Sequence, residues 1–388
     1  ADVVNDWNRL EKQIRLVESN DSSCLVLKCR FEAPSNAVAV PLWDGFCKAL
    51  TVNTRLHSLD LSRNPTFADR GAVALAAALP YNSSLTKLNL RACRIGRTGA
   101  AALAETLGEN RSLVELDMSD NEDIGHGAAL IFSAVRDHKS LEVLKMCACD
   151  LRSDEHTISS LKRLIKYNPL IRTLEIHHNY FPHEALRKLF IAIRESSVTR
   201  LTALDLDSMG VGVVAMKELI ETLNAKTQLT SLSLRKNAIG GPPIAALLKG
   251  IRTNGSLIHL NLARSRLKDV DLKGLGDFLR DPHACLKELD ISDNVLAKHA
   301  MEIIVEQWGG NKSLTSLSLG RNNFSSSDLS HFISYVSASN SWRLEFPAAG
   351  GGVSTISSLD FSELKAFGPA QAKELAALIR TDSTPWDR

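Results

Sequence analysis

Cys147, His177 and Asp207 are the residues of this chain whose types could do chemistry together, and 30 residues separate each from the next. Thiolate, imidazole and carboxylate groups are all zinc ligands, and the same trio can act as nucleophile, base and orienting group. His178 stands beside the second of them. Residues this far apart in sequence meet only if the elements that carry them repeat with the same period.

Those elements follow from a nine-residue phrase that recurs ten times between Leu56 and Asn322, at steps of 28 to 30 residues. Examples are LHSLDLSRN, LVELDMSDN, LTSLSLRKN and LKELDISDN. Apolar residues alternate within each copy, as Leu59 and Leu61 do, and this period of two is typical of a strand with one buried face. A period this regular indicates stacked supersecondary units. The trio holds the seventh position of three successive copies, so we expect its side chains in a row ~5 Å apart.

A helix is predicted for the second half of each repeat, where apolar residues such as Leu103 and Leu107 follow helical spacing. An asparagine recurs near the helix ends, and we interpret it as a left-handed cap, at Asn53, Asn82, Asn110, Asn254 and Asn311. Because the connections are short, the strands must form one parallel sheet with the helices on its other side. The predicted fold is an α/β solenoid, a horseshoe with a concave parallel sheet and convex helices.

The ninth residue of each phrase is expected to be interior although it is polar or soft. These residues are Asn64, Cys93, Asn121, Cys149, Asn179, Met209, Asn237, Ser265, Asn294 and Asn322. An asparagine amide there can satisfy backbone groups that are freed where the strand ends. The cysteines at this position are expected to be small buried side chains.

These phrases resemble the leucine-rich repeat family, and their length with alternating asparagine-type and cysteine-type copies resembles its ribonuclease-inhibitor-like subclass. The resemblance covers roughly three quarters of the chain. It implies a leucine-rich repeat solenoid in an intracellular protein that binds other proteins, a group that includes inhibitors, innate-immune sensor domains, actin-regulating proteins and an activator of the Ran GTPase. The fold alone does not indicate which of these functions the chain has. Met209 and Ser265 replace the expected cysteine, and the ends and the repeat count differ, so ribonuclease inhibition is not carried over.

Three regions are predicted. Residues 1–55 hold a capping helix and an irregular first repeat, in which a longer loop is expected within the segment RFEAPSNAVAVP. The helix rests on the spacing of Trp7, Leu10, Ile14 and Val17, and the first strand on Leu25 and Leu27. Residues 56–338 hold ten regular repeats.

Residues 339–388 are predicted to hold an irregular repeat with a glycine-rich insertion and a cap. Leu344 and Phe346 continue the apolar pattern, Leu359 and Phe361 resume a strand, and a helix is expected near residues 371–379. The glycine run at 350–352 lacks the lysine and the following serine or threonine of a phosphate loop, so we interpret it as a flexible insertion.

Residues between the strand anchors point away from the core and form a polar concave wall. Its central column is Asp60, Asn89, Asp117, Lys145, Glu175, Asp205, Ser233, Asn261, Asp290 and Ser318. The next column is Ser62, Arg91, Ser119, Cys147, His177, Asp207, Arg235, Ala263, Ser292 and Gly320. Such a wall suits a partner matched by charge and hydrogen bonds. The candidate binding residues are Asp117, Asp120, Glu175, His177, Asp205, Asp207, Arg235, Lys236 and Arg264. The alternative is that these charges only solvate an open face.

Catalysis or metal binding by Cys147, His177 and Asp207 is the less favoured interpretation. Parallel strands splay their side chains outward, no oxyanion donor is apparent, and an open wall excludes little water. We therefore predict no enzyme activity, no catalytic residue, no cofactor and no metal. Ordinary surface polarity or partner contact accounts for the trio.

Composition limits the partner and the compartment. With 46 basic and 44 acidic residues, a net charge of +2 and no long run of one sign, nucleic acid is not expected as the main ligand. Seven cysteines without clustered spacing favour a reducing, cytoplasmic compartment. No stretch approaches the ~18 consecutive apolar residues of a membrane span, so none is predicted.

The predicted function is a non-enzymatic interaction or scaffold module that binds a protein through the concave wall and the adjoining loops. One alternative is a GTPase regulator of the Ran-activator type, for which Arg63, Asn64, Arg91 and Arg94 are candidate residues. Another is a structural subunit of a large intracellular assembly that uses its convex helices and irregular ends.

Overall fold

The computed structural model describes residues 12–29 except 22 and 24, residues 36–338 except 152–153, 226, 280–284 and 309–312, and residues 358–360. The chain divides into two compact units, Ala1–Asp205 and Leu206–Arg388. Both are built from the same alternation of a three-residue strand and a helix. Among the described residues, no helix combines the length and the apolar character needed to cross a membrane.

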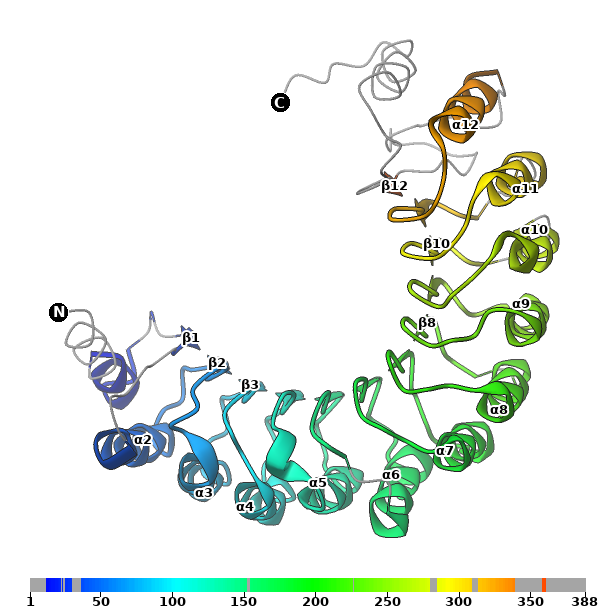
Figure 1. Cartoon of the computed structure of the whole chain (residues 1–388). Helices are drawn as coiled ribbons and strands as arrows, with labels where there is room; N and C mark the ends of the chain where they lie inside the picture. Colours follow the sequence, from blue (N-terminus) through cyan, green and yellow to red (C-terminus); the bar gives the residue numbers. More distant parts are fainter. Residues whose placement is uncertain are drawn as a thin grey trace, which may run out of the picture. The chain divides into compact units, whose positions relative to one another are not determined.

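The first unit contains a parallel sheet whose strand order follows the sequence (Figure 1). Its strands are β1 (Val26–Lys28), β2 (Ser58–Asp60), β3 (Lys87–Asn89), β4 (Glu115–Asp117), β5 (Val143–Lys145), β6 (Thr173–Glu175) and β7 (Ala203–Asp205). Its helices are α2 (Asn36–Leu50), α3 (Ala68–Ala78), α4 (Arg97–Leu107), the 3₁₀ helix η1 (Glu122–Ile124), α5 (Gly127–Arg136), α6 (Glu155–Tyr167) and α7 (His183–Glu195). The central leucines of neighbouring strands are paired in register, as Leu144 is with Leu174.

The second unit repeats this construction. Its strands are β8 (Ser231–Ser233), β9 (His259–Asn261), β10 (Glu288–Asp290), β11 (Ser316–Ser318) and β12 (Ser358–Asp360). Its helices are α8 (Val213–Asn224), α9 (Pro242–Asn254), the 3₁₀ helix η2 (Asp269–Asp271), α10 (Leu272–Leu279), α11 (Lys298–Trp308) and α12 (Ser326–Ala338). In each unit the strands line one side and the helices the other (Figure 1). The predicted α/β repeat with a parallel sheet is confirmed.

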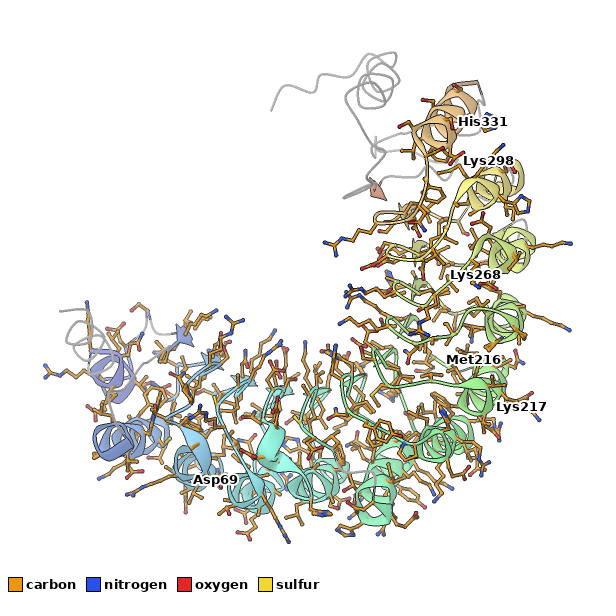
Figure 2. The ribbon with its side chains drawn as sticks, viewed as in Figure 1. Asp69, Met216, Lys217, Lys268, Lys298 and His331 are labelled. Carbon is orange, nitrogen blue, oxygen red and sulfur yellow. The ribbon has the colours of Figure 1, made fainter. Side chains whose placement is uncertain are left out.

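The core of each unit lies between the sheet and the helices. Each strand turns its central leucine inward, and Leu116, Leu144 and Leu174 are fully buried. The helices contribute one face: in α8, Met216 is buried whereas the next residue, Lys217, is exposed and points outward (Figure 2). Burying a leucine-sized side chain contributes ~2 kcal/mol, so the regular anchors of the phrase hold the repeats together.

A ladder of buried side chains at the ninth position of the phrase confirms the prediction for this position. The Asn121 amide donates to the carbonyls of Leu90 at 2.9 Å and Met118 at 2.8 Å. Its Oδ1 accepts from the backbone N–H groups of Cys93 and Ile95, both at 3.0 Å. The Cys93 thiol donates to a strand carbonyl, and burial raises its pKa to about 12. These cysteines are therefore structural and unreactive.

The asparagines near the helix ends behave differently from the prediction. The backbone of Asn53, Asn82 and Asn110 is not left-handed, and these side chains form a second buried ladder. The amide of Asn82 donates to the carbonyls of Leu50 at 2.7 Å and Asn53 at 3.0 Å, and its Oδ1 accepts from Leu85 N. The prediction of left-handed caps was wrong because the side chain, and not the local backbone, satisfies the exposed carbonyls. Asn168 and Asn254 have the same role, and Asn311 lies outside the described residues.

Left-handed backbone occurs instead at the eighth position of every phrase. These residues are Arg63, Ala92, Asp120, Ala148, His178, Ser208, Lys236, Arg264, Asp293 and Arg321, with φ between 49° and 60°. The amides of several of them donate to the next repeat, as Asp120 N does to the Cys147 carbonyl at 2.8 Å. None is a glycine, so the repeat holds a carbon side chain in a conformation that costs about 1 kcal/mol per residue.

The N-terminal prediction needs one correction. Residues 12–18 are helical and bury Ile14 and Val17, whereas Trp7 and Leu10 lie outside the described residues. Strand β1 contains buried Leu27 but not Leu25, which is 47% exposed. Residues 30–35 lie outside the described residues, so the longer loop expected in this segment stays a prediction; the segment is helical from Asn36, and Pro41 lies inside α2. The buried helical face of α2, formed by Trp43, Phe46, Cys47 and Leu50, outweighs the local cost of the proline.

At the C-terminal end, β12 pairs with β11 in parallel, with Ser358 opposite Ser316. The strand that follows β11 in the sheet is therefore the one predicted around Leu359, and residues 339–357 separate it from α12. Leu344, Phe346, the glycine run and the predicted helix near residues 371–379 lie outside the described residues.

Candidate functional site

The wall of the first unit carries a ladder of alternating charges across its strands. Lys87 Nζ lies 3.3 Å from Glu115 Oε2. Lys145 Nζ lies between two carboxylates, 3.9 Å from Glu115 Oε1 and 3.1 Å from Glu175 Oε1. Neighbouring parallel strands are ~4.8 Å apart, so side chains at equivalent positions, and long side chains at diagonal ones such as Glu115 and Lys145, reach one another. Each such pair is worth at most about 1 kcal/mol, but together the pairs hold the side chains in place.

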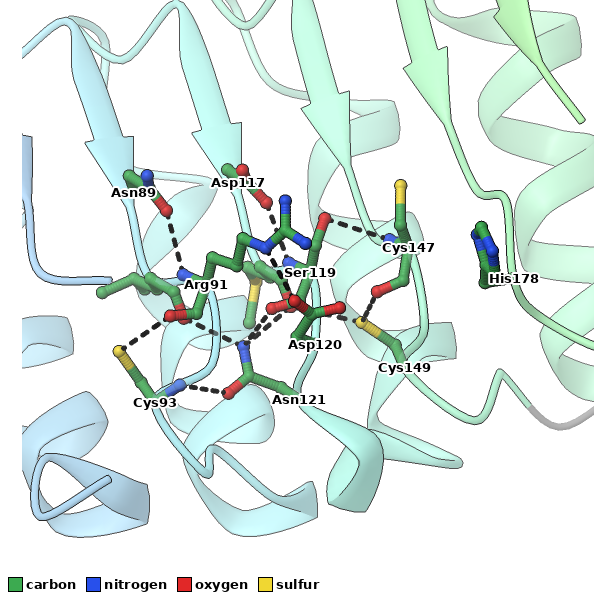
Figure 3. A network of polar contacts seen from close by, with 12 residues as sticks. Asn89, Arg91, Cys93, Asp117, Ser119, Asp120, Asn121, Cys147, Cys149 and His178 are labelled. Atoms are coloured by element: carbon green, nitrogen blue, oxygen red, sulfur yellow. Dashed lines mark hydrogen bonds and ion pairs between the residues drawn. The ribbon is translucent and has the colours of Figure 1, made fainter. Parts of the chain in front are cut away.

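A second network lies at the strand ends of β3, β4 and β5 (Figure 3). Arg91 Nε is 2.7 Å from Asp120 Oδ2, and this hydrogen bond raises the pKa of Arg91. Asp117 Oδ1 accepts from the Ser119 N–H at 2.9 Å. The Ser119 hydroxyl accepts in turn from the Cys147 N–H at 3.1 Å, which fixes the backbone at Cys147 (Figure 3). The predicted residues Asp117 and Asp120 are thus brought onto one rigid surface.

Cys147, Glu175 and His177 form a compact group of potential metal ligands on the wall of the first unit. One ligand atom from each lies within 4.8 Å of the other two. Cys147 is only 4% exposed, and burial raises the pKa of its thiol to about 12. His177 Nε2 lies 3.8 Å from Asp205 Oδ2, and its Nδ1 lies 2.6 Å from Nδ1 of His178.

The structure changes the membership of the trio that the sequence suggested. Cys147 and His177 come together as predicted, but Glu175 is the third member. Asp207 belongs to the second unit, is 9% exposed, and accepts hydrogen bonds from the Ser233 hydroxyl and from Arg235 N. The sequence reasoning missed Glu175 because it followed one column of the wall. Residues two apart on a strand share a face, and this rule places Glu175 beside His177.

The basic candidates lie in the second unit. Lys236 and Arg264 are exposed at the left-handed eighth position, and Arg235 is partly buried. Arg264 Nε is 2.7 Å from Asp293 Oδ2, so this basic group includes a carboxylate.

The four residues considered for GTPase regulation differ in how far their side chains are engaged within the fold. Asn64 is fully buried and donates to the carbonyls of Cys29 and Leu61, and Arg91 is paired with Asp120. Arg63 has left-handed backbone, as does Arg94. Two of the four candidates are therefore committed to contacts within the fold.

His138 is a buried polar residue that the sequence reasoning missed. It takes the place of an asparagine in the second ladder, and its Nδ1 accepts from the backbone N–H groups of Ser140 at 3.2 Å and Leu141 at 3.0 Å. Its Nε2 is buried without a hydrogen-bond partner among the described residues. Burial, with a smaller effect of Arg111, lowers the pKa of His138 to about 4. Its position 28 residues after Asn110 was the available signal.

Comparison with known proteins supports the repeat assignment. A family model described as Leucine Rich repeat matches residues 52–76, 81–104 and 109–127. Human NACHT, LRR and PYD domains-containing protein 12 is 29% identical over 261 residues, which is 66% of this chain and 24% of that protein. Mouse NACHT, LRR and PYD domains-containing protein 14 is 25% identical over 211 residues, or 47% of this chain and 21% of that protein. The chain thus spans about a quarter of the length of these relatives.

Solved structures show the same fold. The leucine-rich repeat-containing protein LegL7 of Legionella pneumophila aligns with a TM-score of 0.50 at 19% identity, and the alignment covers 80% of this chain and 97% of that one. A chain in the yeast Rad7 and Elc1 complex aligns with a TM-score of 0.50 at 16% identity, covering 97% of this chain and 87% of that one. At these identities the likeness extends to the arrangement of strands and helices.

Proposed function

The chain is a leucine-rich repeat protein, and we propose that it is a non-enzymatic module that binds a protein partner through the polar wall of its sheet and the adjoining loops. The wall is the row of half-buried strand residues together with the left-handed residues at its edge. The observation that carries the proposal is that ion pairs and backbone hydrogen bonds already restrict these residues before any partner arrives. Preorganised side chains lose less conformational entropy on binding, which favours affinity.

Two features restrict the residues of the wall. The eighth-position residues have a constrained backbone, and the amides of Arg63 and Asp120 donate to the neighbouring strand at 2.7 and 2.8 Å. The charged groups of the wall hold one another, as Lys145 does with Glu175. In this proposal Asp117, Asp120, Glu175, His177 and Asp205 form the contact surface of the first unit.

Charge indicates the kind of partner that the first unit would take. Along β2 to β7 the wall and its edge carry the carboxylates of Asp60, Glu115, Asp117, Asp120, Glu175 and Asp205, against the cations of Arg63, Lys87, Arg91 and Lys145. The carboxylates outnumber the cations, so we propose a basic segment of a protein as the partner of this surface. Arg235, Lys236 and Arg264 would form a separate contact surface on the second unit. Asp207, being nearly buried, would position Arg235 and not touch the partner.

The test is affinity capture from cell extract at low and at high salt, followed by mass spectrometry. We expect a partner whose capture is lost on Asp117→Lys with Asp205→Lys and is weakened at high salt. Glu105→Lys on the exposed side of α4 is the matched charge reversal and should leave capture unchanged. Unchanged capture by the wall variant would contradict the proposal. A salt-resistant complex of several proteins would favour the structural-subunit alternative, and stimulated GTP hydrolysis in a GTPase panel would favour the regulator.

A further inference from the structure

We propose that Cys147, Glu175 and His177 bind a divalent transition-metal ion of the zinc class on the wall of the first unit. Glu175 and His177 also belong to the proposed contact surface, but metal binding itself needs no partner, because all three ligands belong to this chain. Soft thiolate and borderline imidazole ligands select zinc-class ions over magnesium or calcium, and a carboxylate completes a common zinc ligand set.

The ligand geometry is close to what a zinc ion requires. Zinc bonds of 2.0 to 2.3 Å place the ligand atoms of a tetrahedral site roughly 3.3 to 3.8 Å from one another. In the structure the three atoms lie within 4.8 Å of one another, so a shift of about 1 Å would close the site. Cys147 is held by backbone hydrogen bonds to Ser119 and Asp120, whereas Glu175 and His177 are partly exposed on the wall and can turn toward it.

The surroundings supply orienting groups. Asp205 Oδ2 lies 3.8 Å from His177 Nε2, and His178 Nδ1 lies 2.6 Å from His177 Nδ1. A carboxylate beside a histidine ligand recurs in zinc sites, where it fixes the ring orientation and raises the basicity of the ring. Water can take the remaining coordination position. Binding would release the thiol proton of Cys147 to solvent, since the thiolate is the ligand form.

Local charge also favours a cation. Lys145 competes with a bound cation, because its Nζ lies 3.1 Å from Glu175 Oε1. It also lies 3.9 Å from Glu115 Oε1, so it keeps a carboxylate partner when Glu175 turns to the metal. A bound cation would offset the burial that otherwise disfavours the charged form of Cys147.

Cobalt(II) is a suitable probe, because a cysteine thiolate bound to it gives a charge-transfer absorption band. The protein would be prepared without a polyhistidine tag, kept reduced with a phosphine, and titrated with cobalt(II) and then with zinc as competitor. We expect one equivalent to bind with a thiolate band that zinc removes. Cys147→Ser should abolish that band, and Glu175→Gln and His177→Ala should each weaken cobalt binding at least about tenfold.

Two control variants separate this site from adventitious binding. Cys285→Ser removes an exposed thiol, and His259→Ala removes a partly exposed histidine that is paired with Glu288 at 2.8 Å. Both should leave the band and the affinity unchanged. Absence of a thiolate band in the parent protein, a band that survives Cys147→Ser, or loss of the band in Cys285→Ser would each overturn the proposal. If circular dichroism shows that Cys147→Ser does not fold, the test rests on the cobalt affinity of Glu175→Gln and His177→Ala, whose altered side chains lie on the wall.

Discussion

His138 should make the stability of this protein fall in mild acid, and His138→Asn should remove that fall. Two backbone N–H groups donate to its Nδ1, so the folded state requires the tautomer that carries its proton on Nε2. Protonation of Nδ1 would break both hydrogen bonds inside the core. Asparagine is the residue that fills the same place at Asn110 and Asn168, where its Oδ1 accepts equivalent bonds.

The magnitude follows from the lowered pKa. The ordinary value is 6.5 and the folded value is about 4, so both states are neutral above pH 6.5 and the stability contribution is complete there. Below pH 6.5 this histidine binds a proton in the unfolded chain, whereas in the folded chain it stays neutral until the pH approaches 4. The free energy of unfolding therefore decreases as the pH falls toward 4. Linkage gives a loss of about 1 kcal/mol at pH 5.5 and about 2–3 kcal/mol at pH 4.5.

Urea unfolding of the parent protein and of His138→Asn at pH 7.5, 6.5, 5.5 and 4.5 would measure this effect. Other acid-sensitive groups cancel in the difference between the two proteins, so the stability of the variant relative to the parent should rise by the amounts above. His183→Asn on the exposed start of α7 is the matched control and should show no such trend. A difference between His138→Asn and the parent that stays constant over this pH range would refute the reasoning.

Three further predictions concern the repeat scaffold. Asn121→Ala should lower the free energy of unfolding by about 2–4 kcal/mol, because buried backbone groups on two repeats lose their hydrogen-bond partner. A loss below about 1 kcal/mol in urea unfolding would contradict the stabilising role of the ninth-position ladder. Lys145→Met should destabilise by about 1 kcal/mol at low salt and less at high salt, and a salt-independent effect would argue against the charge ladder. Gly240→Ala should lower the free energy of unfolding by about 1–3 kcal/mol, because a Cβ there would meet the Arg266 carbonyl oxygen at 2.6 Å. Gly108→Ala is the control: its Cβ would meet nothing within 4 Å, so it should leave the thermal melt unchanged.

Local patterns were enough to predict most of the fold. The alternation of Leu59 and Leu61 specified a half-buried strand, and its repetition specified a parallel stack, because a short helix return leaves no other arrangement. The ninth-position ladder was also predictable, since a buried amide must satisfy backbone groups wherever strands end. The second ladder was misread because Asn82 looks locally like a helix cap. Its true partners are the carbonyls of Leu50 and Asn53, about 30 residues earlier.

The candidate site shows the same division. The sequence by itself determined which residues occupy the wall, because strand periodicity sends Glu175 and His177 to the side away from Leu174 and Ile176. Only the tertiary structure decided which of them meet, that Cys147 is buried among carboxylates, and that Asp120 and Glu175 are already paired. The physical reason is that face selection depends on the period of one strand. Ligand distances and ion pairs depend on side-chain rotamers and on the register between strands, which neighbouring repeats set together.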